Sequence, residues 1–251
     1  MPASLFDSRE FNERLFFPRR DRSVPPDGAR ELDVAGEETL HVRCYRAVVD
    51  RPTVLLFHGN GEVVSDYDAQ AEYFDQAGAN LAVMDYRGYG RSTGTPTLRN
   101  ALVDAHQVVA EARSALATPL IVMGRSLGSA CAAELYACSP DGVIGFVIES
   151  GFVDLDALIR RRGMTPPREL RPEDRVAFDS ARKLAKGRLP LLVLHGAADT
   201  MIDADEARRA HAAAGTTHKE LVIIADHGHN DVSSSPLYWE ALGRFVGQLA
   251  Y

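Results

Sequence analysis

The sequence predicts an α/β fold, in which a mostly parallel central β-sheet is flanked by helices on both faces. Short runs of apolar, mostly branched residues recur along the chain, as expected of strands buried on both faces. Stretches with helical spacing lie between these runs, and this alternation is typical of a parallel sheet. The chain has 251 residues, of which 45% are hydrophobic and 25% charged, so one large core is possible. We therefore predict a single domain over residues 1–251.

The first expected element is an antiparallel hairpin at residues 31–48, where apolar and polar residues alternate around a turn at Gly36 and Glu37. It would form one edge of the sheet. Six apolar runs predict the buried strands, at residues 53–57, 81–84, 119–123, 143–148, 190–194 and 221–224. Helical spacing predicts helices at residues 66–77, 98–116, 126–137, 205–214 and 237–249.

The segment at residues 152–184 interrupts this alternation, since it has no clear strand and its prolines, Pro166, Pro167 and Pro172, prevent a long helix. We interpret it as a small cap inserted between two strands. Its arginines suit a solvated helix face, with attraction of anionic acyl substrates as the alternative: Arg160, Arg161, Arg162, Arg168, Arg171 and Arg175. Its apolar side chains would line an acyl pocket or attach the cap to the core: Phe152, Leu155, Leu158 and Met164.

Composition argues against several classes of function. The formal net charge of −7 disfavours a nucleic-acid partner, because such binding depends on clustered Lys and Arg. Charges throughout the first twenty residues predict no signal peptide, and no apolar run reaches the roughly 20 residues that span a bilayer. The three cysteines, Cys44, Cys131 and Cys138, lack metal-ligand spacing and are expected to be buried free thiols. We expect a soluble cytoplasmic protein without an integral membrane segment.

The pattern G-x-S-x-G occurs twice, around Ser92 and around Ser126. The motif indicates a nucleophilic serine only where a strand precedes it and a helix follows it, because that sharp turn exposes the serine oxygen. The Ser126 copy has both, and Gly124 and Gly128 leave room for the crowded backbone. The Ser92 copy lies in a glycine-rich loop with no helix directly behind it. We therefore predict Ser126 as the nucleophile.

A serine nucleophile needs a base to take its proton and a carboxylate to orient that base. Both are expected after late strands, with the acid before the histidine. The candidate acids are Asp199, Asp203, Asp226, Asp231 and Glu149, and the candidate bases are His227 and His229. The histidines that follow earlier strands, His58 and His195, are expected to pack and form hydrogen bonds at strand ends.

With these motifs in view, the chain resembles the α/β-hydrolase family from about residue 53 to the C-terminus. The motifs follow the family's order: His58-Gly59-Asn60-Gly61-Glu62, Asp85-Tyr86-Arg87-Gly88-Tyr89-Gly90-Arg91-Ser92, Gly124-Arg125-Ser126-Leu127-Gly128, His195-Gly196-x-x-Asp199 and Gly228-His229-Asn230-Asp231. The chain is most similar to the small branch that contains protein depalmitoylases and related bacterial esterases. This resemblance implies Asp199 as the acid and His229 as the base. Residues 1–20 contain no cysteine, unlike the N-terminal anchor of eukaryotic depalmitoylases, so esterase activity is favoured over depalmitoylation.

Attack on an acyl carbonyl also requires backbone N–H donors for the developing oxyanion. Leu127 is expected to supply one, at the start of the helix that follows Ser126. The His-Gly-Asn-Gly turn after the first buried strand should supply the second, from Asn60, with Gly61 as the next candidate.

The leading hypothesis is hydrolysis of a carboxylic ester or thioester, on a small-molecule acyl substrate, through an acyl-Ser126 intermediate and without a metal or other cofactor. A small cap predicts short to medium acyl chains. Peptide cleavage or acyl transfer on the same triad is the alternative within this fold. Two further classes are a non-catalytic binding protein and a metal-dependent hydrolase that uses the histidines His58, His195, His227 and His229.

Overall fold

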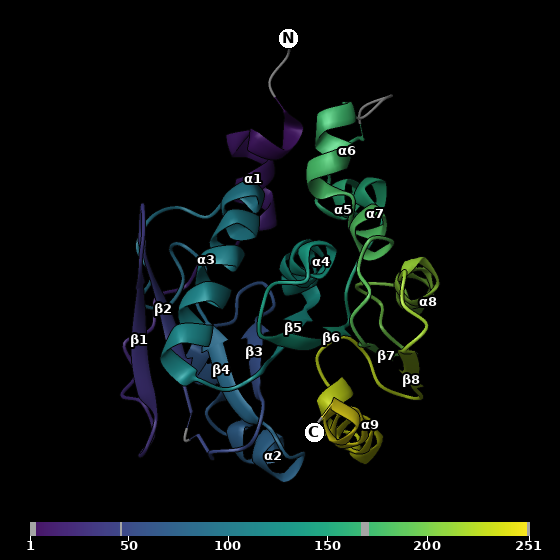
Figure 1. Cartoon of the computed structure of the whole chain (residues 1–251). Coiled ribbons are helices and arrows are strands. Elements are labelled where there is room, and N and C mark those ends of the chain that lie inside the picture. Colours follow the sequence, from purple (N-terminus) through teal and green to yellow (C-terminus); the bar gives the residue numbers. More distant parts are fainter. Residues whose placement is uncertain (1–3, 46, 167–170, 250–251) are drawn as a thin grey trace.

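The computed structural model describes residues 4–45, 47–166 and 171–249, and an eight-stranded sheet lies at its centre (Figure 1). The strand order is β1-β2-β4-β3-β5-β6-β7-β8. β2 runs antiparallel to β1 and β4, and all other neighbours are parallel. The strands are β1 (Arg30–Ala35), β2 (Thr39–Cys44), β3 (Thr53–Phe57), β4 (Asn80–Met84), β5 (Leu120–Arg125), β6 (Val143–Glu149), β7 (Leu191–Gly196) and β8 (Lys219–Ile224). The predicted α/β class with a mostly parallel sheet is confirmed.

The elements expected from the apolar pattern agree closely with the structure. β1 and β2 form the edge hairpin, and the six buried runs correspond to β3 through β8, with ends that differ by at most two residues. Along β3 the side chains alternate between the two faces, so that Leu55 and Phe57 join one apolar cluster while Val54 and Leu56 join the other. Both faces of the sheet are thus buried.

Helices cover these two faces (Figure 1). α2 (Ala71–Gln76) and α9 (Pro236–Leu249) lie on one face, and α3 (Leu98–Leu116), α4 (Ser129–Cys138) and α8 (Ala204–Ala213) lie on the other. The helix expected at 66–77 is instead divided into a 3₁₀ helix, η2 (Val64–Tyr67), and α2. The Asp66 carboxylate accepts a hydrogen bond from the Val63 N–H at 3.0 Å, which fixes a tight turn at the start of this segment.

Three short helices stand between β6 and β7, in the segment expected to form a cap. They are α5 (Leu155–Arg161), α6 (Pro172–Phe178) and α7 (Ser180–Leu184). Pro167 and Arg168 of that segment lie outside the described residues. Phe152, Leu155 and Leu158 are buried in the apolar cluster that includes α4, so they attach this insertion to the core.

The N-terminal segment packs against the same insertion, which the sequence pattern did not predict. This segment forms a 3₁₀ helix, η1 (Leu5–Asp7), and α1 (Arg9–Leu15), and Figure 1 shows both on the same side of the sheet as α5, α6 and α7. The Phe6 ring lies 4.5 Å from the Phe178 ring, and the Ser4 hydroxyl donates to Asp174 at 2.7 Å. We call the described parts of residues 4–20 and 152–184 together the roof. In the described parts of the chain, no helix is long and apolar enough to cross a membrane.

Candidate active site

Ser126 occupies a sharp turn between β5 and the helical segment formed by η3 (Ser126–Gly128) and α4. Its φ of 49° is in the left-handed region, which is uncommon for a residue with a side chain. The flanking glycines are required by close contacts. A Cβ atom on Gly128 would lie 1.9 Å from the Phe57 carbonyl oxygen, and one on Gly124 would lie 2.3 Å from the Gly128 carbonyl oxygen. The turn therefore holds the Ser126 side chain clear of the strand that precedes it.

The structure brings Ser126, His229 and Asp199 into one hydrogen-bonded chain. His229 Nε2 lies 2.9 Å from Ser126 Oγ, and His229 Nδ1 lies 2.7 Å from Asp199 Oδ2. The three side chains follow the carboxyl ends of β5, β7 and β8, where an open parallel sheet places its binding site. This arrangement allows a proton to pass from the serine hydroxyl to the imidazole while the carboxylate holds the ring.

The Asp199 carboxylate is held in its ionised form. Burial alone would raise the pKa of Asp199, but hydrogen bonds from His195 and His229 outweigh burial and keep this pKa well below its usual range. The other oxygen, Oδ1, accepts the N–H groups of Met201 and Ile202, both at 2.8 Å. His195 Nε2 lies 2.8 Å from the Ile202 carbonyl oxygen and 3.2 Å from Asp199 Oδ2, so this nitrogen carries the proton.

The competing acids and the competing base have other partners. Asp203 caps α8 by accepting the Asp205 N–H at 2.8 Å, and Asp231 accepts the Gly228 N–H at 2.6 Å. Asp226 is exposed, and the half-buried His227 places Nδ1 2.7 Å from the Ala225 carbonyl oxygen. Of these residues, the structure places none in hydrogen-bond contact with Ser126.

Ser92, the serine of the other G-x-S-x-G copy, is completely buried. Its hydroxyl donates to the Asp85 carbonyl oxygen at 2.7 Å and accepts the His41 N–H at 2.8 Å. It thereby attaches the loop after β4 to the edge hairpin. Its hydroxyl has no access to a substrate, and its contacts are those of a structural residue.

The two positions expected to bind an oxyanion lie on either side of the Ser126 turn. Leu127 is in the first turn of η3, where backbone N–H groups lack partners within the helix. Asn60 lies in the loop after β3, and its side chain is fully used: Nδ2 donates to the Leu15 carbonyl oxygen at 2.7 Å, and Oδ1 accepts from the Phe17 N–H and the Tyr89 hydroxyl. Within the described residues, the Asn60 backbone N–H has no hydrogen-bond acceptor.

Arg125, the residue before Ser126, joins three loops at the site, and sequence reasoning missed it. Its Nη1 pairs with Glu62 after β3, and its Nε donates to Glu149 at the end of β6 at 3.1 Å. Its Nη2 donates to the His229 carbonyl oxygen at 3.2 Å and to Asn230 Oδ1 at 2.9 Å. The available signal was that Arg125 and Glu149 end two adjacent strands, where opposite charges face each other.

The acids around Arg125 extend its contacts into the backbone of the site. Glu62 Oε2 accepts the Gly59 N–H at 2.6 Å and the Tyr67 hydroxyl at 2.7 Å, which fixes the turn that contains Asn60. Glu149 accepts the Tyr238 hydroxyl at 2.8 Å. Burial raises the pKa of the Glu149 carboxyl group, and the adjacent Arg125 charge offsets only part of that rise.

The histidines of the metal-hydrolase hypothesis do not gather in one place. His195 and His229 contact Asp199, whereas the buried His58 lies with Asp85, 3.6 Å from Nε2 to Oδ1. Burial alone would raise the pKa of Asp85, but its hydrogen bond to His41 and the nearby His58 hold that pKa well below its usual range.

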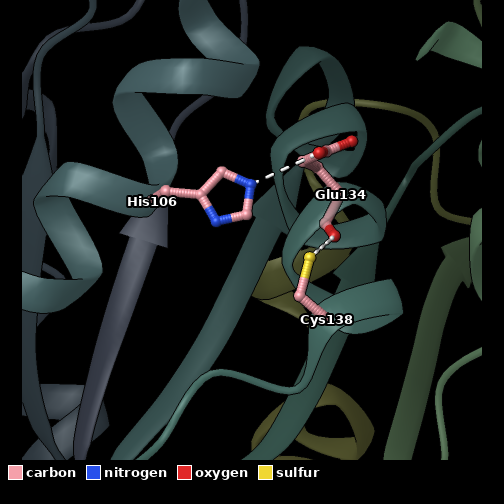
Figure 2. A group of neighbouring side chains, drawn as sticks. All are labelled: His106, Glu134 and Cys138. Atoms are coloured by element: carbon pink, nitrogen blue, oxygen red, sulfur yellow. Dashed lines mark hydrogen bonds and ion pairs between the residues drawn. The ribbon is translucent and has the colours of Figure 1, made fainter.

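One group of potential metal ligands occurs among the described residues, at His106, Glu134 and Cys138, whose ligand atoms lie within 4.8 Å of one another (Figure 2). Figure 2 shows the His106 ring directed at the Glu134 carboxylate and the Cys138 sulfur directed at the Glu134 backbone carbonyl. Lys183 Nζ lies 2.5 Å from Glu134 Oε2, so an ammonium group already compensates this carboxylate. We interpret the group as a brace between α3, α4 and α7.

All three cysteines are free thiols. Cys44 and Cys131 are buried as expected, whereas Cys138 is exposed, so the expectation of burial was wrong there. Cys138 lies in the last turn of α4, where its sulfur donates to the Glu134 carbonyl oxygen at 3.3 Å.

Comparison with known proteins finds one matching family model and several similar proteins. The family model described as serine aminopeptidase, S33, matches residues 50–172. The uncharacterized protein YfhR of Salmonella typhimurium is 29% identical over 212 residues, which cover 77% of this chain and 70% of YfhR. The protein bem46 of Schizosaccharomyces pombe is 25% identical over 205 residues, which cover 79% of this chain and 68% of bem46.

Solved structures resemble the whole fold at low sequence identity. The esterase Pf2001 of Pyrococcus furiosus superposes with a TM-score of 0.76 at 18% identity, over 93% of this chain and 99% of the esterase. A monoacylglycerol lipase of Paleococcus ferrophilus superposes with a TM-score of 0.61 at 20% identity, over 86% of this chain and 99% of the lipase. The sheet order, the turn at Ser126 and these likenesses together show that the chain has the α/β-hydrolase fold.

Proposed function

We propose that the protein is a serine hydrolase that cleaves a carboxylic ester or thioester of a small acyl substrate. The observation that carries this proposal is the continuous hydrogen-bonded chain from Ser126 through His229 to Asp199. Ser126 Oγ attacks the acyl carbonyl carbon while His229 Nε2 takes the hydroxyl proton. The ionised Asp199 stabilises the imidazolium and keeps its Nδ1–H directed toward the carboxylate.

The tetrahedral intermediate collapses when the imidazolium of His229 returns the proton to the leaving alcohol or thiol. The acyl-Ser126 ester is then hydrolysed by a water molecule that His229 deprotonates, which restores the free serine. The backbone N–H groups of Leu127 and Asn60 would bind the oxyanion in both steps, and losing one such donor costs about 3–4 kcal/mol of barrier. These steps need no metal or organic cofactor.

Ester or thioester cleavage is favoured by the esterase and lipase among the similar structures. Peptide cleavage on the same triad is the second candidate, because the matching family model is described as a serine aminopeptidase. Rates with an acyl ester and with the aminoacyl amide of the same leaving group separate the two candidates. The buried free thiols Cys44 and Cys131 support the cytoplasmic, reducing location expected from the sequence.

The test of the nucleophile is labelling with a fluorophosphonate, followed by intact and peptide mass spectrometry. We expect one adduct on Ser126, which persists in Ser92→Ala and disappears in Ser126→Ala. Ester hydrolysis should disappear in the same variant. Absence of both labelling and hydrolysis in the correctly folded wild-type protein would refute the proposal and favour the binding-protein alternative.

A series of p-nitrophenyl esters of increasing acyl length tests the substrate. The roof over the site is small, and its apolar side chains Phe152, Leu155 and Leu158 are buried against the core. We therefore expect the highest kcat/KM with short to medium chains. An optimum at long acyl chains would contradict this expectation.

A further inference from the structure

Arg161 and Arg162, at the end of α5 in the roof, each contain a buried nitrogen without a hydrogen-bond partner among the described residues. These atoms are Nη2 of Arg161 and Nε of Arg162. Both side chains are half-buried, whereas the preceding Arg160 is exposed. Basic residues are common in the last turn of a helix, where they complement the helix dipole from solvent. That role explains Arg160, but it does not explain two guanidinium groups withdrawn from water.

Arg161 lies on the side of the site that holds the triad acid. Its guanidinium stands 6.0 Å from the centre of the Phe152 ring. The Phe152 N–H donates to Ser129 Oγ at 3.2 Å, and that hydroxyl donates to the Ser126 carbonyl oxygen at 2.6 Å. The charge of Asp199 is close enough to act on Arg161. A short series of contacts thus connects Arg161 to the nucleophile turn.

The acid nearest to Arg161 satisfies it only in part. Glu206 Oε1 lies 3.9 Å from Arg161 Nη1, beyond hydrogen-bond distance. The other oxygen, Oε2, accepts the N–H groups of Val153 and Asp154 at 2.7 and 3.0 Å. Glu206 is therefore held mainly by the backbone, and Arg161 retains donors that can bind another anion.

Arg162 lies near Tyr89, which contacts the loop that contains Asn60. Tyr89 is close enough to act on the Arg162 charge, and the Tyr89 hydroxyl donates to Asn60 Oδ1 at 2.7 Å. The backbone carbonyl oxygen of Arg162 accepts from Arg14 at 3.4 Å, which places the end of α5 against α1. Among the described residues, no carboxylate forms an ion pair with the Arg162 guanidinium.

Buried guanidinium nitrogens without a hydrogen-bond partner among the described residues are unfavourable for the free protein. Burial lowers the pKa of both side chains, and for Arg162 the neighbouring Arg161 lowers the pKa further. A buried charge with unsatisfied donors destabilises a fold unless a partner compensates it. An anionic ligand would supply the partner, because carboxylate and phosphate oxygens match the donor geometry of Arg.

We propose that Arg161 and Arg162 bind an anionic oxygen group, a carboxylate or a phosphate, on the substrate whose acyl group Ser126 receives. This inference rests on the proposed hydrolase function and adds the substrate class to it. The two arginines would hold the charged end of the substrate between the acid side and the oxyanion side of the site. A neutral ester would fill the same site without this contact.

The kinetic test compares matched neutral and anionic esters. Mono-p-nitrophenyl adipate against p-nitrophenyl hexanoate places the charge on the acyl group, and p-acetoxybenzoate against phenyl acetate places it on the leaving group. We expect kcat/KM for the anionic member of one pair to exceed that of its neutral partner by at least about tenfold, as for a hydrogen bond to a charged group. In Arg161→Gln/Arg162→Gln this ratio should fall toward one, whereas Arg161→Lys/Arg162→Lys should keep part of it.

Arg160→Gln is the matched control, because this exposed arginine precedes the pair in the same helix. It should keep the wild-type ratio. The inference is wrong if neither pair of esters shows a preference in the wild type, or if Arg160→Gln lowers the ratio as much as the double variant does.

Stability separates a ligand-binding role from a structural one. Because Arg162 has no acidic partner among the residues that the structure describes, Arg162→Gln should leave the Tm unchanged or raise it while it lowers the preference for anionic esters. A structural role predicts the reverse, a lower Tm with an unchanged preference.

Binding without turnover tests the site independently of hydrolysis. Adipate and inorganic phosphate, as separate probes, distinguish the two anion types, and at least one should raise the Tm of the wild type and of Arg160→Gln. Neither should raise the Tm of the double variant. Equal Tm shifts in all three proteins would overturn the anion site, even if the fluorophosphonate labels Ser126. If the anions raise the Tm as expected but the wild type is not labelled by the fluorophosphonate and does not hydrolyse esters, only the proposed hydrolase function is refuted.

Discussion

The backbone of Ser126 stores strain at the centre of the site. A residue with a Cβ atom at φ 49° costs of order 1–2 kcal/mol relative to glycine in that conformation. Ser126→Gly should therefore be more stable than Ser126→Ala, by about 1 kcal/mol, in urea unfolding. Ser92 has an ordinary φ, so there the order should reverse, with Ser92→Ala more stable than Ser92→Gly. The same order at both positions would show that the Ser126 turn relaxes without strain.

Arg125 provides a prediction about positioning. Arg125→Gln removes the contacts to Glu62 and to the His229 backbone, and we expect kcat to fall about 10- to 100-fold, as for small misplacements of reacting groups. Measurements of kcat and KM, well below the Tm, test this effect.

Two variants control for the Arg125 prediction. Arg125→Gln/Glu149→Gln removes one charge of each sign, and kcat should stay low because the contacts of Arg125 to Glu62 and to the His229 backbone are still missing. Arg91→Gln alters the equivalent arginine in the other G-x-S-x-G copy, where the side chain is exposed and pairs with Glu31, and it should leave kcat and KM unchanged. An unchanged kcat in Arg125→Gln would contradict a positioning role for this arginine.

Among single residues, the sequence predicted those that stand in a recognisable motif. Ser126, Asp199 and His229 stand in patterns that specify a local backbone, and the structure brings these three together as hydrogen-bonded neighbours. Their catalytic roles stay predictions. Arg125 and Arg162 could not be assigned from sequence, because the role of a charged side chain depends on whether tertiary contacts bury it and which acids then face it.

Among the elements, the brace between α3, α4 and α7 predicts how stability depends on pH. Burial would raise the pKa of Glu134, but His106 and Lys183 outweigh it and lower the pKa from 4.5 to about 2. The ionised group therefore stabilises the fold above pH 4.5, and this contribution is lost as the pH falls toward 2. Glu134→Gln should cost about 1–3 kcal/mol at pH 7 and progressively less below pH 4.5.

Urea midpoints of wild type and variant between pH 7 and pH 3 measure this change. Glu111→Gln, at an exposed position on α3, is the matched control and should show no such convergence. A stability gap that stays constant over this pH range would mean that the Glu134 ion pairs contribute little.

Helices and strands were predictable where the apolar pattern of their own residues determines which side chains are buried. α3 and the six strands from β3 to β8 contain apolar residues at regular spacing, and their ends lay within two residues of expectation. η1 and α1 were missed, because this short segment becomes stable only by burying Phe6 and Phe11 against α6 and α3. Helical spacing also did not reveal that the segment expected as one helix at 66–77 is divided into η2 and α2.

For the molecule as a whole, we predict one cooperative unfolding transition, as expected for the single domain proposed from the sequence. One apolar cluster includes residues from α1, α4 and α5, so the roof shares its core with the sheet. Phe6→Ala should lower the Tm of that transition without splitting it, at a cost of about 3–5 kcal/mol. Phe17→Ala, at a side chain 55% exposed, should have little effect. Two separate transitions in calorimetry would show that the roof is an independent unit.

The roof has a consequence for engineering. It is assembled from residues 4–20 and from the described part of the insertion between β6 and β7, joined where Phe6 meets Phe178. A chimaera that exchanges only the insertion between related hydrolases would combine two surfaces that were never selected to fit each other. A chimaera in this fold should therefore take the N-terminal segment and the insertion from the same parent protein.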